Sequence, residues 1–340
     1  MGSIKEIMKG DNINISNDNV AQLPLVSICS ITYNHAPYIR QCLDGFLMQK
    51  TNFKYEIIIH DDASTDGTAE IIKEYVEKHP DLITPVFQTE NQYSKGLRGF
   101  YTKFVYPRAK GKYIALCEGD DYWTDPLKLQ KQVDFLEANP DYVLCSTRFT
   151  IYSQYNQSMS EELLPIIGND DDLTYLLDDY ILDKIWYTQP LTSMFRKIER
   201  VFDAHKACSY SKDATLFYLL LKEGKGMLLK DVMGVYRDHA GGIWTAVSNL
   251  DKILGGLKTI KGLYDFDHSN ESANYLYNYM FSKGYLGSDF WIKECRLYFN
   301  ILFNIIISKL GWLSGLKLFA RNANAFASLK HVLLNKFYSN

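Results

Sequence analysis

Three features are missing or scarce in this sequence, and each absence argues against a class of protein. The apolar segment 297–310 is too short, and too broken by Asn, Ser and Lys, to cross a bilayer. The six cysteines form no CxxC pair and have no histidine at zinc-ligand spacing, so we expect them to be thiols in a reducing compartment. Positive charge is not in excess: the net charge of −3 argues against nucleic acid as a partner.

The first 22 residues are polar and rich in asparagine, and they lack the apolar core of a signal peptide. Glu6 stands where a myristoylation signal requires Ser or Thr. We therefore expect 1–22 to be a polar leader and the protein to be cytoplasmic.

Strand-like apolar runs alternate with segments of helical periodicity in the first half of the chain. This alternation predicts an α/β fold with a Rossmann-like, doubly wound, mostly parallel sheet that carries helices on both faces. Later in the chain we expect a helix at 214–222, a short strand pair near 227–236 and helices from about 250 onward. The expected strands are 25–33, 55–61, 83–88, 112–117 and 142–149, and the expected helices are 37–49, 68–78, 98–109 and 126–138.

Two pairs of adjacent aspartates follow expected strands: Asp61-Asp62 and Asp120-Asp121. Ligands of doubly wound sheets bind beyond the carboxyl ends of the strands, so both pairs occupy the edge where a ligand is expected. Like charges placed together are costly unless something neutralises them, and a divalent cation that bridges a pyrophosphate is one solution. A loop or helix cap is the alternative interpretation for either pair taken alone.

Three segments in order, 24–49, 56–68 (EIIIHDDASTDGT) and 111–142 (with EGDDYW), resemble the inverting family 2 glycosyltransferases of GT-A fold. The resemblance extends over about 24–150 and continues more weakly to about 245. It implies a GT-A catalytic domain over 23–250, with a nucleotide-binding half at 23–150 and an acceptor half at 151–250. A helical, basic, amphipathic region would follow at 251–340.

The resemblance also implies which residues bind the donor nucleotide. Ile31 and Tyr33, in ITYN, would contact the nucleoside, with the Tyr33 ring stacked on the base. Asp62 would accept a hydrogen bond from the base edge, as uracil N3–H offers, while Asp61 would support the turn. A tyrosine of the core is the alternative for Tyr33.

The EGDD segment corresponds to the DxD-like element of the family. We interpret Asp121 as the main ligand of Mn²⁺ or Mg²⁺ and Asp120 as a contact of the donor ribose or sugar, with Glu118 as a further candidate. The later segment YRDH adds His239, which would complete the metal shell or contact the diphosphate, and Arg237, which would offset the diphosphate charge.

An inverting transfer needs a carboxylate that takes a proton from the acceptor hydroxyl. The resemblance places this base at Asp213, for which a favourable helix-dipole charge is the alternative role. Trp244 follows a Gly-Gly pair and suggests a loop that closes over the donor or acceptor. Lys95 and Arg98 are weaker candidates for donor phosphates, with solvated surface as the alternative.

The C-terminal segment 293–340 carries seven Lys or Arg against one Glu, interleaved with aromatic and aliphatic residues. This pattern suggests amphipathic helices on an anionic membrane, at the inner face of the cytoplasmic membrane. A lid packed on the catalytic domain and an oligomer contact are the alternatives, and the oligomeric state stays open.

The sequence therefore predicts a metal-dependent glycosyltransferase of surface-polysaccharide biosynthesis. The donor is expected to be a nucleotide-diphospho-sugar, UDP-linked by preference, and the acceptor a glycan or lipid-linked glycan. An inert protein that binds nucleotide-sugar or glycan is one alternative. A nucleotidyltransferase is another, although ITYNHAPYI lacks the Gly-rich basic loop of that class.

Overall fold

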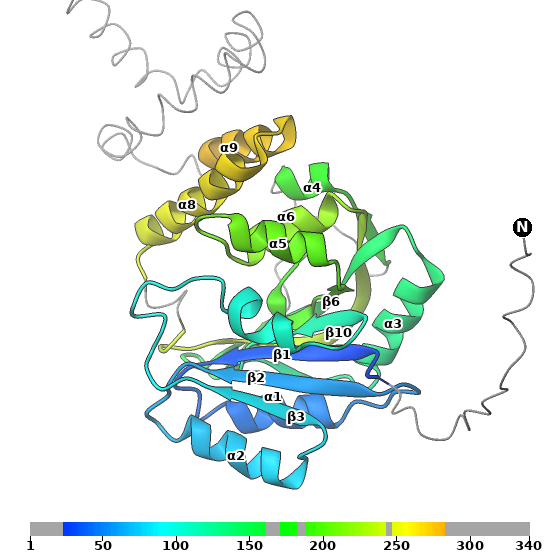
Figure 1. Cartoon of the computed structure of the whole chain (residues 1–340), viewed down its shortest axis with the longest axis vertical. Coiled ribbons are helices and arrows are strands. Elements are labelled where there is room, and N and C mark those ends of the chain that lie inside the picture. Colours follow the sequence, from blue (N-terminus) through cyan, green and yellow to red (C-terminus); the bar gives the residue numbers. More distant parts are fainter. Residues whose placement is uncertain (1–22, 161–170, 183–187, 243–246, 283–340) are drawn as a thin grey trace, which may run out of the picture.

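A mixed sheet covered by helices on both faces forms the body of the protein (Figure 1). The computed structural model describes residues 23–160, 171–182, 188–242 and 247–282. The strands are β1 (Val26–Thr32), β2 (Tyr55–Asp61), β3 (Ile83–Phe87), β4 (Tyr113–Leu116), β5 (Tyr122–Trp123), β6 (Tyr142–Ser153), β7 (Ser158–Ser160), β8 (Leu173–Tyr175), β9 (Met194–Arg196) and β10 (Lys225–Asp238). The helices are α1 (Ile39–Leu47), α2 (Thr68–Lys78), α3 (Lys128–Ala138), α4 (Leu177–Ile181), α5 (Glu199–Ala207), α6 (Asp213–Leu221), α8 (Asn249–Asp267) and α9 (Asn270–Ser282).

The sheet runs in the order β3-β2-β1-β4-β9-β6-β10-β5, with β7 on β6 and β8 on β10. The first four strands are mutually parallel, as the alternation with helices predicts. Strand β9 is antiparallel to both neighbours, β4 and β6, while β6 and β10 are parallel to each other. The carboxyl ends of β1, β2 and β4 therefore meet at one edge of the sheet.

Apolar residues alternate between the two faces of the central strands. In β2, Ile57 and Ile59 pack into the core cluster shared with α1, α2 and α3, whereas Ile58 faces the cluster shared with α5 and α6. Five cysteines of the described residues are free and buried within or beside these clusters. Two buried cores, one on each face, explain why the strands read as nearly continuous apolar runs.

Two local predictions were wrong. The segment near 227–236 is one strand, β10, because its polar middle is satisfied by tertiary partners: Asp172 accepts from the Lys230 N–H at 2.8 Å, and Asp231 pairs with Lys131 at 2.6 Å. The expected helix at 98–109 is a π-helix at Tyr101–Val105 followed by a 3₁₀ turn at Tyr106–Arg108. Pro107 lacks an N–H and so cannot continue regular helical bonding.

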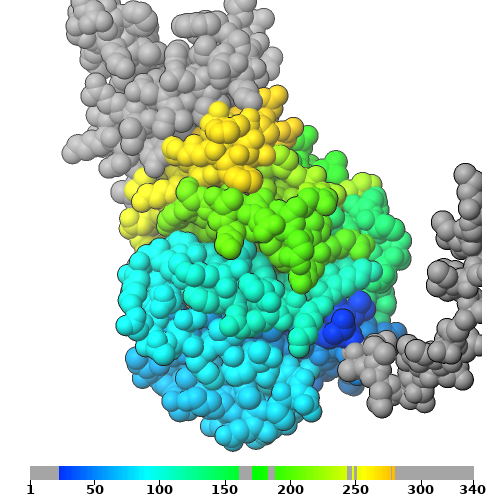
Figure 2. Space-filling view, in the orientation of Figure 1, coloured from blue at the N-terminus to red at the C-terminus, as the bar shows by residue number. Residues whose placement is uncertain are grey.

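The helices expected from about 250 are present as α8 and α9. Helix α8 packs on α6 and α9 packs on α4. The two helices, yellow in Figures 1 and 2, lie beyond the green helices α5 and α6. Within the described ranges, no helix is both long and apolar enough to span a membrane. The leader 1–22, Trp244 and the basic segment 293–340 lie outside the described residues.

One lysine of the core is fully buried. Lys128 Nζ donates to Gln132 Oε1 at 2.7 Å and lies 4.2 Å from the centroid of the Trp123 ring. Burial lowers the pKa of Lys128 from 10.5 to about 7. Between these two values the unfolded chain binds more protons than the folded one, so this residue makes stability rise with pH in that window.

We therefore expect Lys128→Met to flatten the pH dependence of stability between pH 7.5 and 9.5. The parent should gain up to about 1 kcal/mol per pH unit in unfolding free energy from this group. Urea denaturation at the two pH values measures the slope, and Lys54→Met, at an exposed position, is the control. An unchanged slope in Lys128→Met would show that the ammonium titrates normally in the folded state.

Candidate active site

Two loops at the carboxyl ends of β1 and β2 are cross-linked by hydrogen bonds. The N–H groups of Asn34, His35 and Ala36 donate to the side chains of Ser64, Thr68 and Asp66 at 2.8, 2.8 and 2.9 Å. In return, Asn34 Oδ1 accepts from the Thr65 N–H at 2.9 Å. The STDGT run thus has a structural purpose: it fixes the segment that follows Tyr33.

A third loop, Glu118–Asp121, follows β4 and lies against the end of β1. The Gly119 N–H donates to the Ile31 carbonyl at 3.0 Å. The backbone oxygen of Ile31 therefore helps to hold this loop against β1. A Cβ on Gly119 would lie 2.6 Å from Thr32 Oγ1 and 2.7 Å from Thr32 Cβ. Only glycine allows this close approach, which brings Asp120 and Asp121 to the sheet edge.

The first aspartate pair divides into two environments. Asp61 accepts from both the N–H and the hydroxyl of Ser64, so it supports the turn. Asp62 accepts the N–H groups of Gln92 and Tyr93 at 2.9 and 3.0 Å. The Asp62 N–H donates to the carbonyl of Thr32 at 3.0 Å, and the side chain of Tyr33, the next residue, is exposed. Each Asp62 oxygen retains a further lone pair for a ligand.

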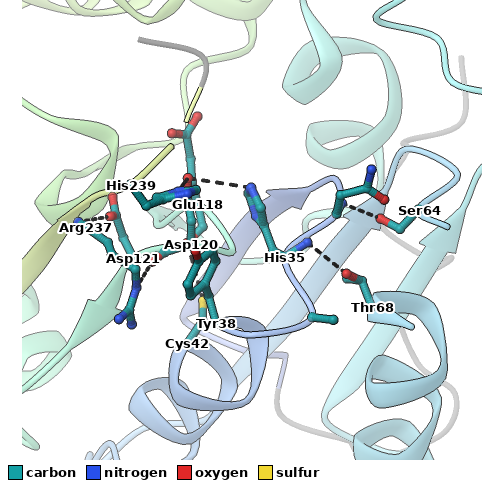
Figure 3. A network of polar contacts seen from close by, with 12 residues as sticks. His35, Tyr38, Cys42, Ser64, Thr68, Glu118, Asp120, Asp121, Arg237 and His239 are labelled. Atoms are coloured by element: carbon teal, nitrogen blue, oxygen red, sulfur yellow. Dashed lines mark hydrogen bonds and ion pairs between the residues drawn. The ribbon is translucent and has the colours of Figure 1, made fainter. Parts of the chain in front are cut away.

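Asp120 lies between two histidines (Figure 3). Its Oδ2 is 3.2 Å from His239 Nε2 and 3.6 Å from His35 Nε2. Its Oδ1 is buried and has no hydrogen-bond partner among the described residues. Burial alone would raise the pKa of Asp120, but the hydrogen bond with His239 and the nearby His35 outweigh it and lower the pKa.

Asp121 is more deeply enclosed, with 3% of its surface exposed. Its Oδ1 accepts the Arg237 N–H at 2.8 Å, so the carboxylate joins the turn to β10. Burial and the adjacent Asp120 raise the pKa of Asp121 well above its ordinary range. Asp121 thus has a structural role through its Oδ1, while its Oδ2 takes no part in that bond, so its assignment as a metal ligand stays a prediction.

Arg237 braces the same turn from β10. Its Nε donates to the Asp120 carbonyl and its Nη2 to Gln41 Oε1, each at 2.7 Å. Its guanidinium carbon also lies 4.9 Å from the ring centroids of both Tyr38 and Tyr122. Arg237 is thus engaged within the protein through Nε and Nη2, and its contact with the diphosphate stays a prediction.

Two residues of the site were not singled out from the sequence: His35 and Tyr38. The Tyr38 ring lies 4.5 Å from the His239 ring, centroid to centroid, and its hydroxyl donates to Gln154 at 2.9 Å. Both follow Tyr33 within the motif NHAPY. Their position just after a strand at the ligand edge could have indicated them as site residues. Nothing in the sequence spacing predicts that they contact Asp120 and His239.

Asp213 is the first residue of α6, on the opposite side of the sheet from α1 and α2. The residue is exposed, yet enough protein surrounds its carboxyl for desolvation to raise its pKa. Burial, together with the charges of Asp120 and Asp213, raises the pKa of Glu118 to about 8. The structure therefore brings Asp213 into electrostatic contact with the Glu118–Asp121 turn, 92 or more residues away in the chain.

Lys95 and Arg98, the two basic candidates, contact other residues of the segment 90–98. Lys95 pairs with Glu90 at the surface. The Arg98 guanidinium stacks 4.0 Å from the Tyr93 ring centroid and donates to the Leu97 carbonyl at 2.6 Å. Tyr93 is also one of the residues whose N–H binds Asp62, so the segment is tied to the first aspartate pair.

The sheet order, the three loops and the aspartates identify the protein class. The sequence profile of Glycosyl transferase family 2 matches residues 27–198, and the chain belongs to this family. The fold is that of GT-A glycosyltransferases, as the sequence predicted. Asp213, Arg237 and His239 lie beyond the matched residues.

Two curated relatives are similar in sequence. The uncharacterized protein Rv1520 of Mycobacterium tuberculosis is 38% identical over 221 residues, which cover 64% of this chain and 60% of Rv1520. The putative teichuronic acid biosynthesis glycosyltransferase TuaG of Bacillus subtilis is 35% identical over 162 residues, covering 48% of this chain and 59% of TuaG. The match thus spans about 60% of the length of these relatives.

The solved structure of S. aureus TarS 1–349 in complex with UDP-GlcNAc has the same fold. It aligns with a TM-score of 0.59 at 17% sequence identity and covers 83% of this chain and 80% of that one. At this identity the likeness establishes the fold only.

We expect Gly119→Ala to destabilise the site turn, because the added methyl group would lie 2.6 Å from Thr32 Oγ1. Overpacking of this kind costs about 1–3 kcal/mol of unfolding free energy. Chemical denaturation measures it. Gly255→Ala is the control, since the nearest atom to its added Cβ is 3.5 Å away. Equal stability of the two variants would contradict the close packing of the turn on β1.

Proposed function

We propose that the chain is an inverting, metal-dependent glycosyltransferase that moves a sugar from a UDP-sugar donor to a glycan acceptor in surface-polysaccharide biosynthesis. One observation carries the proposal: Asp120, in the Glu118–Asp121 turn at the ligand edge of the sheet, lies 3.2 Å from His239 and keeps a buried Oδ1 that accepts no hydrogen bond from the described residues. The charge of Asp213, at the start of α6, also contributes to the raised pKa of Glu118 in this turn. A carboxylate for the donor side and a carboxylate for the acceptor side are thereby brought to one place. The similarity to TuaG, a putative teichuronic acid biosynthesis glycosyltransferase, supports the polysaccharide context.

The chemistry of the turn fits a divalent cation. Carboxylate oxygens suit Mg²⁺ or Mn²⁺, imidazole is also a metal ligand, and the buried Asp120 Oδ1 has no hydrogen-bond partner among the described residues. In the described part of the chain no three His, Cys, Asp or Glu side chains form a ready cation site. Asp120 and His239 would therefore hold the cation together with the phosphates of the donor.

This assignment replaces Asp121 by Asp120 as the main ligand. Asp121 Oδ1 already accepts the Arg237 N–H, and the residue is almost wholly enclosed. Asp120 contacts His239 through its Oδ2 at 3.2 Å, and its buried Oδ1 accepts no hydrogen bond from the described residues. When bound, the cation would stabilise the negative charge of the departing nucleoside diphosphate.

Asp213 acts on the other partner of the reaction. Its carboxylate takes the proton of the acceptor hydroxyl while that oxygen bonds to the anomeric carbon and the bond from this carbon to the diphosphate oxygen breaks. Desolvation raises the pKa of Asp213, which makes the carboxylate a stronger base than an ordinary aspartate. Glu118, with a pKa of about 8, keeps its proton at neutral pH and so adds little repulsion to the developing site.

The nucleobase would lie between Tyr33 and Asp62. The exposed Tyr33 ring offers a flat face, and Asp62 has lone pairs beyond those used by Gln92 and Tyr93. A carboxylate that accepts from N3–H favours uracil over purines. The UDP-GlcNAc bound to TarS, which shares the fold, is consistent with a UDP-linked donor.

Asp120→Asn and Asp121→Asn should separate the two acids. Asn at 121 keeps the oxygen that accepts the Arg237 N–H, so Mn²⁺-dependent UDP binding should survive. Asn at 120 removes a charged ligand, and UDP affinity in Mn²⁺ should fall by more than about 100-fold, beyond what loss of an outer-shell partner costs. Calorimetry with UDP and GDP, in Mn²⁺ and in EDTA, measures this.

If Asp121→Asn lost more UDP affinity in Mn²⁺ than Asp120→Asn, Asp121 would be the main metal ligand. Affinity for UDP that is equal in Mn²⁺ and EDTA would remove the metal from the proposal, and GDP binding as tight as UDP would remove the uracil assignment. Melting temperatures of both variants serve as the control for folding.

Asp213→Asn should keep donor affinity and lose turnover. The substitution retains shape and removes basicity, so UDP release from UDP-GlcNAc or UDP-glucose, with water as the acceptor, should slow by on the order of 10²–10⁴. Glu199→Gln, in the first turn of α5, is the control for loss of a helix N-terminal charge. Parent-like turnover of Asp213→Asn would exclude it as the base, and inactivity of the parent on every sugar donor would favour an inert binding protein.

A further inference from the structure

The position of Asp213 depends on the segment Ser209–Lys212 that precedes it. Asp213 begins α6, so the carboxyl moves with this segment and with the first turn of the helix. The Lys212 carbonyl accepts from the N–H groups of Thr215 and Leu216, which makes it the starting point of α6. Whatever fixes Ser209–Lys212 therefore fixes Asp213.

Helix α8 packs directly on this segment through a glycine. A Cβ on Gly262 would lie 2.9 Å from Ser209 Oγ and 3.3 Å from the backbone nitrogen of Tyr210. Gly255 lies two turns earlier in α8, and a Cβ there would meet only Lys212 Nζ, at 3.5 Å. Gly262 thus makes a close backbone approach, whereas Gly255 faces the end of a flexible side chain.

The helix is itself anchored to α6. Asp267, at the end of α8, accepts from the hydroxyl of Tyr218 in α6 at 3.0 Å and pairs with Lys222, which directly follows α6. Leu257, Ile260 and Leu263 of α8 are buried in the core cluster that also holds α6. Because these contacts fix α8 on the body of the protein, the surface it presents at Gly262 is rigid.

Other elements hold the same segment from different sides. His205 Nε2 of α5 lies 2.9 Å from the Lys212 carbonyl. A Cβ on Gly99 would lie 3.2 Å from Ser211 Oγ, so the loop before the π-helix Tyr101–Val105 also approaches the segment closely. Ser209–Lys212 is therefore contacted by protein from several sides. Because the segment cannot move freely into solvent, a displacement at Gly262 would also move Asp213.

We propose that α8, through the contact of Gly262 with Ser209 and Tyr210, is the positioning element for the base Asp213. This inference rests on the proposed function. Residues 249–282 lie outside the stretch matched by the family profile, which ends at 198. On this proposal they are a working part of the catalytic site rather than an appendage.

Gly262→Val is the test, and Gly255→Val is its matched control. Both place the same β-branched residue in α8, so both carry the same cost in helix propensity. In Gly262→Val the added atoms must displace the backbone at Tyr210. A displacement of about 1 Å can cost 10²-fold in rate, so kcat for UDP release should fall by about 10- to 100-fold while the Kd for UDP with Mn²⁺ stays within about 2-fold. Gly255→Val should keep parent kcat.

The outcomes separate the inference from the function on which it depends. Equal kcat in Gly262→Val and the parent, equal losses in both valine variants, or a parallel loss of UDP affinity would overturn the positioning role. Gly262→Ala takes the place of the valine variant if the latter does not fold, with a smaller loss in the same direction. Asp213→Asn is assayed in the same series: parent-like turnover there refutes the assignment of the base, whatever Gly262→Val does.

Discussion

The concentration of negative charge at one edge of the sheet is the constraint on which the rest of this structure depends. Burial and the nearby Asp120 raise the pKa of Asp121, and burial with the charges of Asp120 and Asp213 raises the pKa of Glu118. The protein treats them differently. His239 and His35 hold Asp120 in its charged form, Asp121 gives its oxygen to a backbone N–H, and Glu118 keeps its proton at neutral pH.

Residues from several distant segments of the chain stabilise the Glu118–Asp121 turn. Gly119 allows the turn to touch β1, and Arg237 ties it to β10 and α1 through three different groups. The loops after β1 and β2 are held by each other's hydrogen bonds instead of by regular structure. Since each partner comes from a different strand, the site forms only when the whole sheet has formed.

The side of the sheet that carries Asp213 is built on a separate core. Helices α5, α6, α8 and α9 stack outward from the sheet, and α8 meets the segment before α6 at Gly262 and α6 itself at Asp267. An inverting reaction needs the base and the leaving group on opposite faces of the sugar carbon. Under the proposed function, the strand ends would bind the donor and α6 would present the base Asp213.

Much of this was determined by local sequence. The periodicity predicted β1, β2, α2 and α6 nearly to the residue, and the resemblance predicted the GT-A fold, because buried strands and amphipathic helices leave periods that tertiary contacts rarely override. The same reasoning predicted that the acidic pairs follow strands, since parallel strands end at one edge.

Only the tertiary structure decided how those acids differ. Nothing in EGDD distinguishes Asp120 from Asp121: the distinction comes from His239 and Arg237, which lie more than 110 positions later in the chain. The tertiary structure alone also decided that β10 is a single strand and that Gly262 contacts Ser209 and Tyr210. Sequence patterns report the period with which one segment buries its side chains, but hydrogen-bond partners and close backbone approaches depend on which distant segment arrives beside it.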